Sequence, residues 1–382
     1  MGLFATRTRL LLISVLGLFV WGCAPVVERT TDVVGTRTVV ALLPDAKTSQ
    51  QMRKVALAGG YTPVDETRLN GLRLTMLTLE RPADVTSDQA IEQLEGAVPG
   101  STVGINHAYR VQQGAAGKGD LDYANDLMGW DKNGCVARAP VGVIDTGIDT
   151  NAPQLAGTRI VTRSFFKNPV VATEHGTQVA SVLANPTRLR GVKIYGANVF
   201  GQRDALGVKA GADALVRALD WLAEEDVRFV NLALAGPYNK ILELAVERAV
   251  GRGLILVAAV GNDGPSVAPR YPAGFDDVIA VTAVDATGRL YRNAVRGPHV
   301  DVAGPGVEVL VPSGSGIRFV TGTSIATPFV TARLAADPSL SAVRSVSQVR
   351  ARLAATSAEL GIKGRDPMFG YGLTLARGVC GD

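Results

Sequence analysis

Residues 141–147 read VGVIDTG, an apolar, β-branched run that ends in an aspartate and a turn. Four more short apolar runs follow along the chain: Ile194–Phe200, Phe229–Leu234, Leu254–Val260 and Val278–Ala283. Between them, residues 211–225 and 240–252 carry the periodicity of amphipathic helices. Strands that are apolar throughout and alternate with helices predict a parallel sheet with both faces covered. The sequence therefore predicts an α/β fold, a parallel sheet flanked by helices.

The composition is that of a globular protein, with 382 residues of which 47% are apolar and 19% are charged. The formal net charge is +4, and Lys and Arg are interspersed with Asp and Glu, with no basic tract. We therefore expect no nucleic-acid partner. We also expect no cofactor, and the acidic pair Asp276-Asp277 lacks a metal-ligand pattern.

The N-terminus has the order of an export signal. Two arginines precede the apolar run Leu10–Val20, which is too short to span a bilayer comfortably but suits a signal core. The residues that end at Cys23 resemble a bacterial lipobox, although Trp21 stands where a small residue is usual. We predict a signal peptide over 1–22, lipid on Cys23 and a periplasmic or cell-envelope location, tethered to a membrane before maturation. Plain secretion and a retained anchor are the alternatives.

Residues 37–111 predict a small α+β domain, after a linker over 23–36. Strands are expected at Thr38–Leu43, Pro63–Leu69, Leu72–Leu79 and Val103–Val111, and helices at Ser49–Ala58 and from Ser87 to about Leu94. This order suits a sandwich of one sheet and two helices. Residues 112–125 are rich in glycine and polar residues, which predicts an exposed, cleavable linker. The larger α/β unit then spans 126–382.

Four polar side chains stand at the ends of the predicted elements of the larger unit. Asp145 and Asn262 follow strands, whereas His175 and Ser324 each open a helical pattern. A serine nucleophile needs a base to take its proton, a carboxylate to orient that base and a donor to meet the oxyanion. Taken singly, each residue also has an ordinary structural reading as a turn residue, a helix cap or a buried histidine.

Together, the four segments resemble the signature segments of the subtilisin family, in that family's order Asp, His, Asn, Ser. The resemblance implies that Asp145 orients His175, which acts as base and then as acid. Ser324 would attack the scissile carbonyl, and Asn262 would stabilise the oxyanion with the Ser324 amide. An α/β-hydrolase is excluded because the serine comes last in the chain and Ala326 occupies the second glycine of the nucleophile elbow.

The same resemblance implies a substrate site. Leu234-Ala235-Gly236 matches the family's strand that pairs with an extended peptide. Ala259 and Val260 would flank the main specificity pocket. Residues 37–111 resemble the family's propeptide, which is a small α+β domain that chaperones its enzyme.

Arg270 bears on specificity. It precedes Tyr271-Pro272-Ala273, which matches a segment at the pocket floor, where a cis bond before Pro272 is expected. A cation that points into the pocket would favour Asp or Glu on the acyl side of the cut. The alternative is that Arg270 points to solvent.

The chain has three cysteines. If Cys23 carries lipid, Cys135 and Cys380 remain as an even pair in an oxidising compartment. They lie at the start and the end of the catalytic region, and we predict a disulfide between them. Two separate thiols are the alternative.

The sequence thus predicts a serine endopeptidase that acts on protein or peptide substrates and is processed from its own propeptide. The alternative from another class is a catalytically silent binding or chaperone-like protein on the same fold. Many subtilisins bind calcium near the loop after the histidine helix, but residues 183–191 hold no Asp or Glu. We therefore expect no calcium there, and Asp120 with Asp122 leaves a weak site elsewhere as an alternative.

Overall fold

The computed structural model describes residues 33–111, 123–166, 173–204, 207–225, 227–313 and 316–380. The predicted signal peptide, Cys23 and most of the linker over 112–125 lie outside the described residues, as do Asp120 and Asp122. In the part of the chain that is described, no helix has the length and apolar character needed to cross a bilayer.

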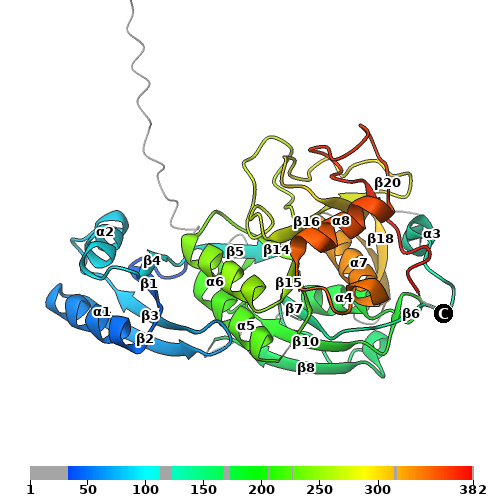
Figure 1. The fold of residues 1–382 in the computed structure, drawn as a ribbon. Coiled ribbons are helices and arrows are strands. Elements are labelled where there is room, and N and C mark those ends of the chain that lie inside the picture. The colour runs from blue at the N-terminus through cyan, green and yellow to red at the C-terminus, as the bar shows by residue number, and fades with distance from the viewer. Residues whose placement is uncertain are drawn as a thin grey trace, which may run out of the picture.

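A nine-stranded sheet forms the centre of the larger unit (Figure 1). Its strands, in spatial order, are β20 (Ser357–Ala358), β21 (Leu373–Thr374), β17 (Val302–Pro305), β16 (Val278–Val284), β15 (Ile255–Ala259), β13 (Phe229–Leu232), β7 (Val141–Asp145), β10 (Lys193–Asn198) and β8 (Arg159–Ser164). All neighbours pair parallel except β20 with β21. The predicted α/β class is confirmed.

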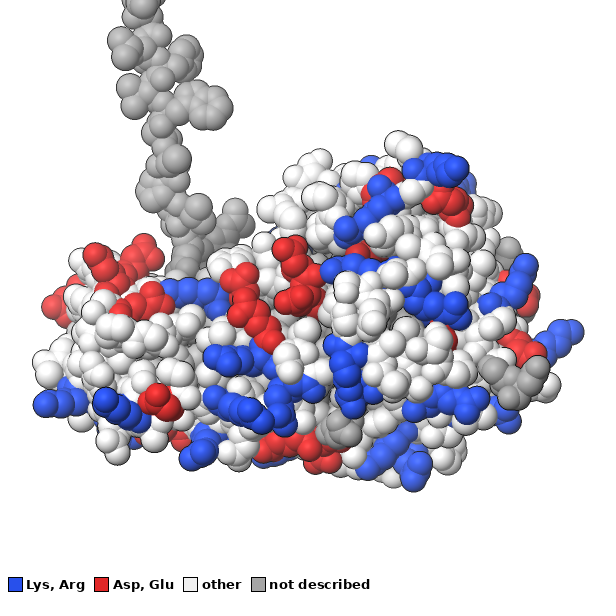
Figure 2. Space-filling model, viewed as in Figure 1, with Lys and Arg blue, Asp and Glu red and all other residues white. Residues whose placement is uncertain are grey.

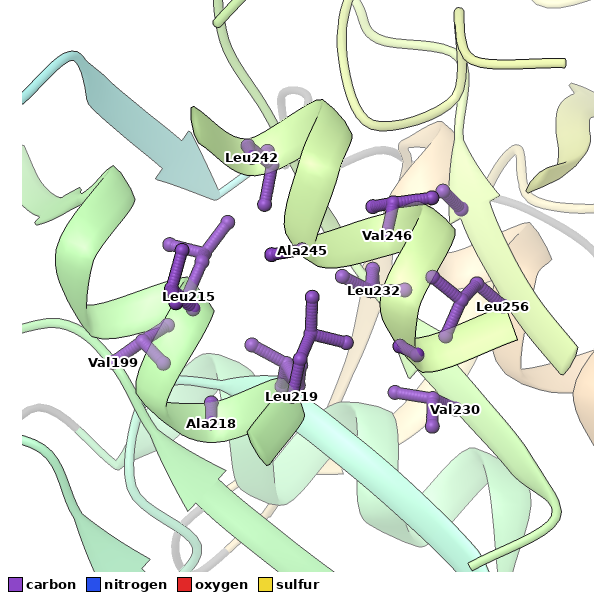
Figure 3. Close-up of a cluster of buried hydrophobic side chains, with 14 of the residues drawn as sticks. Val199, Leu215, Ala218, Leu219, Val230, Leu232, Leu242, Ala245, Val246 and Leu256 are labelled. Atoms are coloured by element: carbon purple, nitrogen blue, oxygen red, sulfur yellow. The ribbon is translucent and has the colours of Figure 1, made fainter. Parts of the chain in front are cut away.

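Helices cover both faces of this sheet, and the strands are apolar because each buries both of its faces. The helices are α4 (Glu174–Leu183), α5 (Ala212–Glu224), α6 (Lys240–Gly251), α7 (Thr323–Ala336) and α8 (Val346–Thr356). Leu256 of β15 packs with α5 and α6, whereas its neighbour Val257 packs with α4 and α7. Figure 3 shows side chains of α5 and α6 meeting those of β13 and β15 in one apolar cluster.

Smaller elements lie at the periphery of the sheet. They are α3 (Tyr123–Met128), β6 (Cys135–Val136), β9 (Leu189–Arg190), η2 (Pro153–Leu155), η3 (Pro338–Leu340), β11 (Gln202–Asp204), β18 (Val309–Ser313) and β19 (Gly316–Val320). β18 and β19 form an antiparallel hairpin that leads into α7, and β6 pairs parallel with β9.

The N-terminal domain is an antiparallel sheet in the order β2-β3-β1-β4 with two helices (Figure 1). Its elements are β1 (Thr38–Leu43), α1 (Ala46–Ala58), β2 (Thr62–Leu69), β3 (Leu74–Glu80), α2 (Ser87–Ala97) and β4 (Thr102–Ile105). Both helices begin at side-chain caps: Asp45 accepts the N–H of Thr48 at 2.7 Å, and Thr86 forms a capping box with Gln89.

The prediction of one strand over Val103–Val111 is wrong. The structure has two strands there, because β5 (Ala108–Val111) leaves the N-terminal sheet. β5 lies between β12 (Gly207–Gly211) and β14 (Leu234–Ala235) of the larger unit and pairs antiparallel with both. A strand of the N-terminal domain is therefore built into the larger unit.

The break between β4 and β5 has a local cause at the start of α5. Asn106 Oδ1 accepts the N–H of Asp213 at 3.1 Å, and the His107 carbonyl accepts the N–H of Ala212 at 3.0 Å. First-turn amides of a helix have no acceptor within the helix. Asn106 and His107 supply these acceptors, so the chain turns from its own sheet onto α5.

The N-terminal domain packs on α5 and α6, as Figure 1 shows. One face of its sheet joins the apolar cluster of those helices through Val40, Leu42, Leu69, Leu72, Leu74 and Met76. Two ion pairs flank this contact: Arg217 binds Asp65 at 3.0 Å, and Lys240 binds Glu95 at 2.6 Å. The domain is thus held by apolar burial, which contributes most, and by part-exposed ion pairs, which contribute little.

Candidate active site

The structure brings Asp145, His175 and Ser324 together from three elements. Asp145 is the last residue of β7, and His175 and Ser324 are the second residues of α4 and α7. His175 Nδ1 lies 2.8 Å from Asp145 Oδ1 and 3.0 Å from Oδ2. His175 Nε2 lies 3.1 Å from Ser324 Oγ. The three side chains form one continuous hydrogen-bonded chain that is buried throughout.

Local contacts hold Asp145 and His175 in place. Asp145 Oδ1 accepts the N–H of Thr146 at 2.6 Å, and Thr146 Oγ1 accepts the N–H of Gly176 at 2.8 Å. These bonds join the end of β7 to the first turn of α4. A Cβ on Gly176 would lie 2.5 Å from the Thr146 carbonyl oxygen, so only glycine allows this approach.

This geometry suits nucleophilic catalysis. Asp145 accepts a bond at Nδ1, which selects the His175 tautomer whose Nε2 can take the Ser324 proton. His175 can then return that proton to a leaving amine. The arrangement gives no support to the catalytically silent alternative, because the side chains already have the contacts that catalysis needs.

Asn262 lies beside the nucleophile on the loop after β15. Its Oδ1 accepts bonds from the N–H of Thr323 at 3.1 Å and from Thr323 Oγ1 at 2.9 Å. The side-chain oxygen is thus committed to Thr323, and the amide nitrogen is the end that can donate. The Ser324 amide stands in the first turn of α7, where N–H groups lack helical acceptors. Both donors flank Ser324, as an oxyanion site requires.

β14 carries an extended partner strand in this structure. Val111 of β5 lies opposite Leu234, and Arg110 lies opposite Ala235. The next β5 residue back, Tyr109, is fully buried, and its hydroxyl donates to the Pro237 carbonyl at 3.1 Å. Burial raises the pKa of Tyr109, so the phenol stays protonated and keeps this bond. β14 therefore accepts a peptide backbone and a large side chain.

Sequence reasoning missed two parts of this arrangement, β12 and the buried Tyr109. The partner strand β12 flanks β5 on the side away from β14, with Ala210 opposite Tyr109. Gly236 follows β14, and a Cβ there would lie 2.5 Å from the Tyr109 ring. The available signal was the small residue at 236, which predicts close approach of another group.

The residues expected around the specificity pocket lie near Asn262. Ala259 ends β15, and both Ala259 and Val260 are fully buried. The peptide bond before Pro272 is cis, as predicted. Arg270 lies neither free in the pocket nor free in solvent: its Nε donates to Asp263 Oδ2 at 2.7 Å.

The loop after α4 holds a buried cation. Arg188 is 4% exposed, and it donates to the Val182 carbonyl at 3.0 Å and to Asn125 Oδ1 at 2.7 Å. Its guanidinium also lies 4.6 Å from the centroid of the Phe329 ring. Arg188 thus joins α3, α4 and α7 around one positive charge. Among the described residues, no cluster of three or more His, Cys, Asp or Glu is suited to a metal ion.

Cys135 and Cys380 are paired in the structure, with their Cα atoms 5.0 Å apart. That separation lies within the range of protein disulfides. The pair joins β6, near the start of the larger unit, to the C-terminal segment.

The chain is similar to known proteins over this region. The model of the Subtilase family matches residues 138–372. Subtilisin DY of Bacillus licheniformis is 33% identical over 237 residues, which are 59% of this chain and 85% of that protein. The thermophilic serine proteinase of Bacillus sp. (strain AK1) is 34% identical over 264 residues, 66% of this chain and 62% of that protein.

A solved structure supports the same fold. Fervidolysin of Fervidobacterium pennivorans, described as a keratinolytic enzyme related to subtilisin, aligns with a TM-score of 0.72 at 22% identity. The alignment covers 91% of this chain and 61% of that chain. Because the family model matches more than half of the chain, the chain belongs to the subtilase family and is a subtilisin-like serine endopeptidase.

Proposed function

We propose that this protein hydrolyses peptide bonds through an acyl-enzyme formed on Ser324. His175 takes the proton of Ser324 Oγ as the oxygen attacks the scissile carbonyl, and Asp145 stabilises the imidazolium. Asn262 and the Ser324 amide stabilise the oxyanion. His175 then protonates the leaving amine and activates the water that releases the acid. The observation that carries the proposal is the continuous Asp145–His175–Ser324 hydrogen-bond chain.

Substrate is proposed to bind as β5 binds, extended and antiparallel to β14. Backbone hydrogen bonds to Leu234-Ala235-Gly236 would supply affinity without sequence selection, and side-chain pockets would supply specificity. The pairing of Val111 with Leu234 supports this mode.

We further propose that residues 37–111 are a propeptide that inhibits its own enzyme. β5 occupies the strand position that a substrate needs, and cleavage within 112–125 would separate the two parts. If Cys23 carries a lipid in the cell envelope, this cut would free the catalytic domain, because Cys135 and Cys380 both lie downstream of it. A propeptide that stays bound without a covalent link would delay release.

The test of the proposed function is covalent labelling by a fluorophosphonate probe of the purified wild type after processing and of Ser324→Ala, which is expected to remain an uncut precursor. The probe reacts with a serine that an adjacent base activates. We expect the probe to be attached to the peptide that contains Ser324 in the wild type, and we expect no labelled peptide from Ser324→Ala. A folded wild-type protein that takes up no label would contradict the proposed mechanism.

Arg270 and Asp263 lead to a prediction on specificity. Asp263 neutralises Arg270 at 2.7 Å, so we expect the wild type to show only a weak preference for Asp or Glu on the acyl side of the cut. Asp263→Asn leaves the cation without its partner and should raise kcat/KM for acidic residues by about five-fold relative to alanine.

A peptide-library cleavage profile measures this shift. Asp276→Asn, an exposed acid on a neighbouring turn, is the matched control and should keep the wild-type profile. If the Asp263→Asn variant gave the same cleavage profile as the wild type, a role of Arg270 in the specificity pocket would be excluded.

Arg188 leads to a prediction on stability. We propose that its buried charge holds the loop after α4 in place of a metal ion, so that a chelator leaves Tm unchanged. Arg188→Met would leave the carbonyl of Val182 and the Asn125 oxygen without their donor, at a cost of about 1–3 kcal/mol each. For a unit of this size, a fall in Tm of roughly 5 °C or more follows.

Differential scanning calorimetry with and without EDTA checks both parts. Arg190→Met, two residues further along and exposed on β9, is the control and should shift Tm little. A large EDTA-induced fall in the wild type would contradict the calcium-independent loop.

A further inference from the structure

A cavity of about 570 Å³ opens beside the start of α4. Its walls come from the turn at 149–154, from residues 173–178 and from the β18–β19 hairpin. The same helix turn carries His175, and the hairpin leads into the segment that bears Ser324. The cavity therefore adjoins α4, which carries His175, and the hairpin that precedes α7.

The cavity is separate from β5, the strand proposed to inhibit the enzyme. β5 pairs with β12 and β14, and none of the residues of these three strands lines the cavity. The chain is next described at Tyr123, whose hydroxyl donates to the Val307 carbonyl, shortly before β18, at 2.7 Å. Figure 1 shows β5 and α3 on opposite sides of α4 and α7. A peptide that lies along β5 and extends beyond Ser324 would thus approach the hairpin and its cavity.

Three charged side chains line this cavity, and two of them neutralise each other. Glu174 binds Arg318 Nη1 at 2.7 Å and also accepts a bond from Ser313 Oγ at 3.2 Å. Asp149 Oδ1 accepts the backbone N–H of Asn151 at 3.0 Å. Among the described residues, no Lys or Arg lies within ion-pair distance of Asp149. Within the described part of the chain, the carboxylate of Asp149 is therefore an uncompensated negative charge of this cavity.

The chain as a whole carries no strong excess of either charge. Figure 2 shows Lys and Arg interspersed with Asp and Glu over the face that it displays, and the formal net charge of the chain is only +4. Local charge should therefore decide what the cavity accepts, because separated surface charges are screened within about 10 Å at ordinary salt.

We propose that this cavity binds the part of the substrate that follows the cut bond, and that Asp149 makes it favour Lys or Arg there. The proposal rests on the proposed peptidase function and deepens it by naming a substrate class. Glu174 neutralises Arg318, so repulsion of an incoming cation is weak. An ion pair at such an exposed site changes kcat/KM by about three-fold.

Internally quenched peptides test this subsite. They share all residues before the cut and differ only after it, where one position holds Lys, Gln or Glu. Each enzyme is first processed and its active sites are titrated with a fluorophosphonate. We expect the wild type to prefer Lys over Gln by about three-fold at low salt. Asp149→Asn should abolish the preference, and Arg318→Gln should enlarge it.

Asp131→Asn is the matched control. Asp131 accepts a backbone bond from Asn133 at 2.8 Å, the same two-residue turn that Asp149 makes, but it does not line the cavity. This variant should keep the wild-type ratio. Equal cleavage of the three peptides by the wild type, or a Lys preference that survives in Asp149→Asn, would overturn the subsite and leave the peptidase proposal intact. A wild type that neither cuts any peptide nor reacts with the probe would overturn both.

Discussion

Replacing Ser324 by alanine is expected to leave the protein as an uncut precursor. Ser324 Oγ lies 3.1 Å from His175 Nε2 and is the atom that would attack the carbonyl. Alanine has no such atom, so peptide hydrolysis should fall by at least about 10⁴-fold. Because the cut within 112–125 is proposed to be made by the same site, the propeptide should stay joined to the catalytic domain. Mass spectrometry of the purified chains measures this directly.

The same variant tests release from the membrane. In cells, the wild-type catalytic domain should be recovered in the soluble fraction, whereas Ser324→Ala should stay with the membranes through the lipid proposed on Cys23. Ser341→Ala, an exposed serine, is the control and should be processed like the wild type. Equal membrane retention of wild type and Ser324→Ala would count against release by self-cleavage.

Replacing Asn262 by alanine has the second-largest expected effect. The oxygen of Asn262 is held by Thr323 at 2.9 and 3.1 Å, so the amide nitrogen is preorganised before substrate arrives. A donor of this kind acts mainly on the charge that develops in the transition state. We therefore expect kcat to fall by about 10²- to 10³-fold, the loss that removing one oxyanion donor causes in subtilisin itself, with KM nearly unchanged.

Steady-state kinetics on a peptide anilide separate kcat from KM. Asn293→Ala, at an exposed asparagine of a nearby loop, is the matched control and should keep wild-type kinetics. A rise in KM with kcat unchanged would assign Asn262 to ground-state binding instead of oxyanion stabilisation.

Much of the site could be predicted because four segments of the sequence resemble the signature segments of the subtilisin family, and that resemblance assigns roles to Asp145, His175, Asn262 and Ser324. Taken singly, each of these residues also fits an ordinary turn, helix-cap or buried position, so local pattern alone does not identify the site. The ion-pair partner of Arg270 could not be predicted in this way. Its ion pair with Asp263 depends on how one loop folds back on itself.

The N-terminal domain shows the same division. Periodicity located its helices and most of its strands, because alternation and capping are local signals. It failed at residues 103–111, where two strands have the apolar character expected of one. The division at Asn106 depends on acceptors for the first amides of α5, and α5 lies more than a hundred residues further along the chain.

By itself, then, the sequence determined the α/β class and the order of the central strands and of most helices, since these rest on local periodicity, and its resemblance to the subtilisin family indicated the triad of Asp145, His175 and Ser324. Tertiary structure alone decided that β5 pairs with β14, that Arg188 bridges three helices and that Asp149 faces a cavity beside α4. These contacts join residues far apart in the chain, and their geometry depends on how strands and helices pack, which no local pattern encodes.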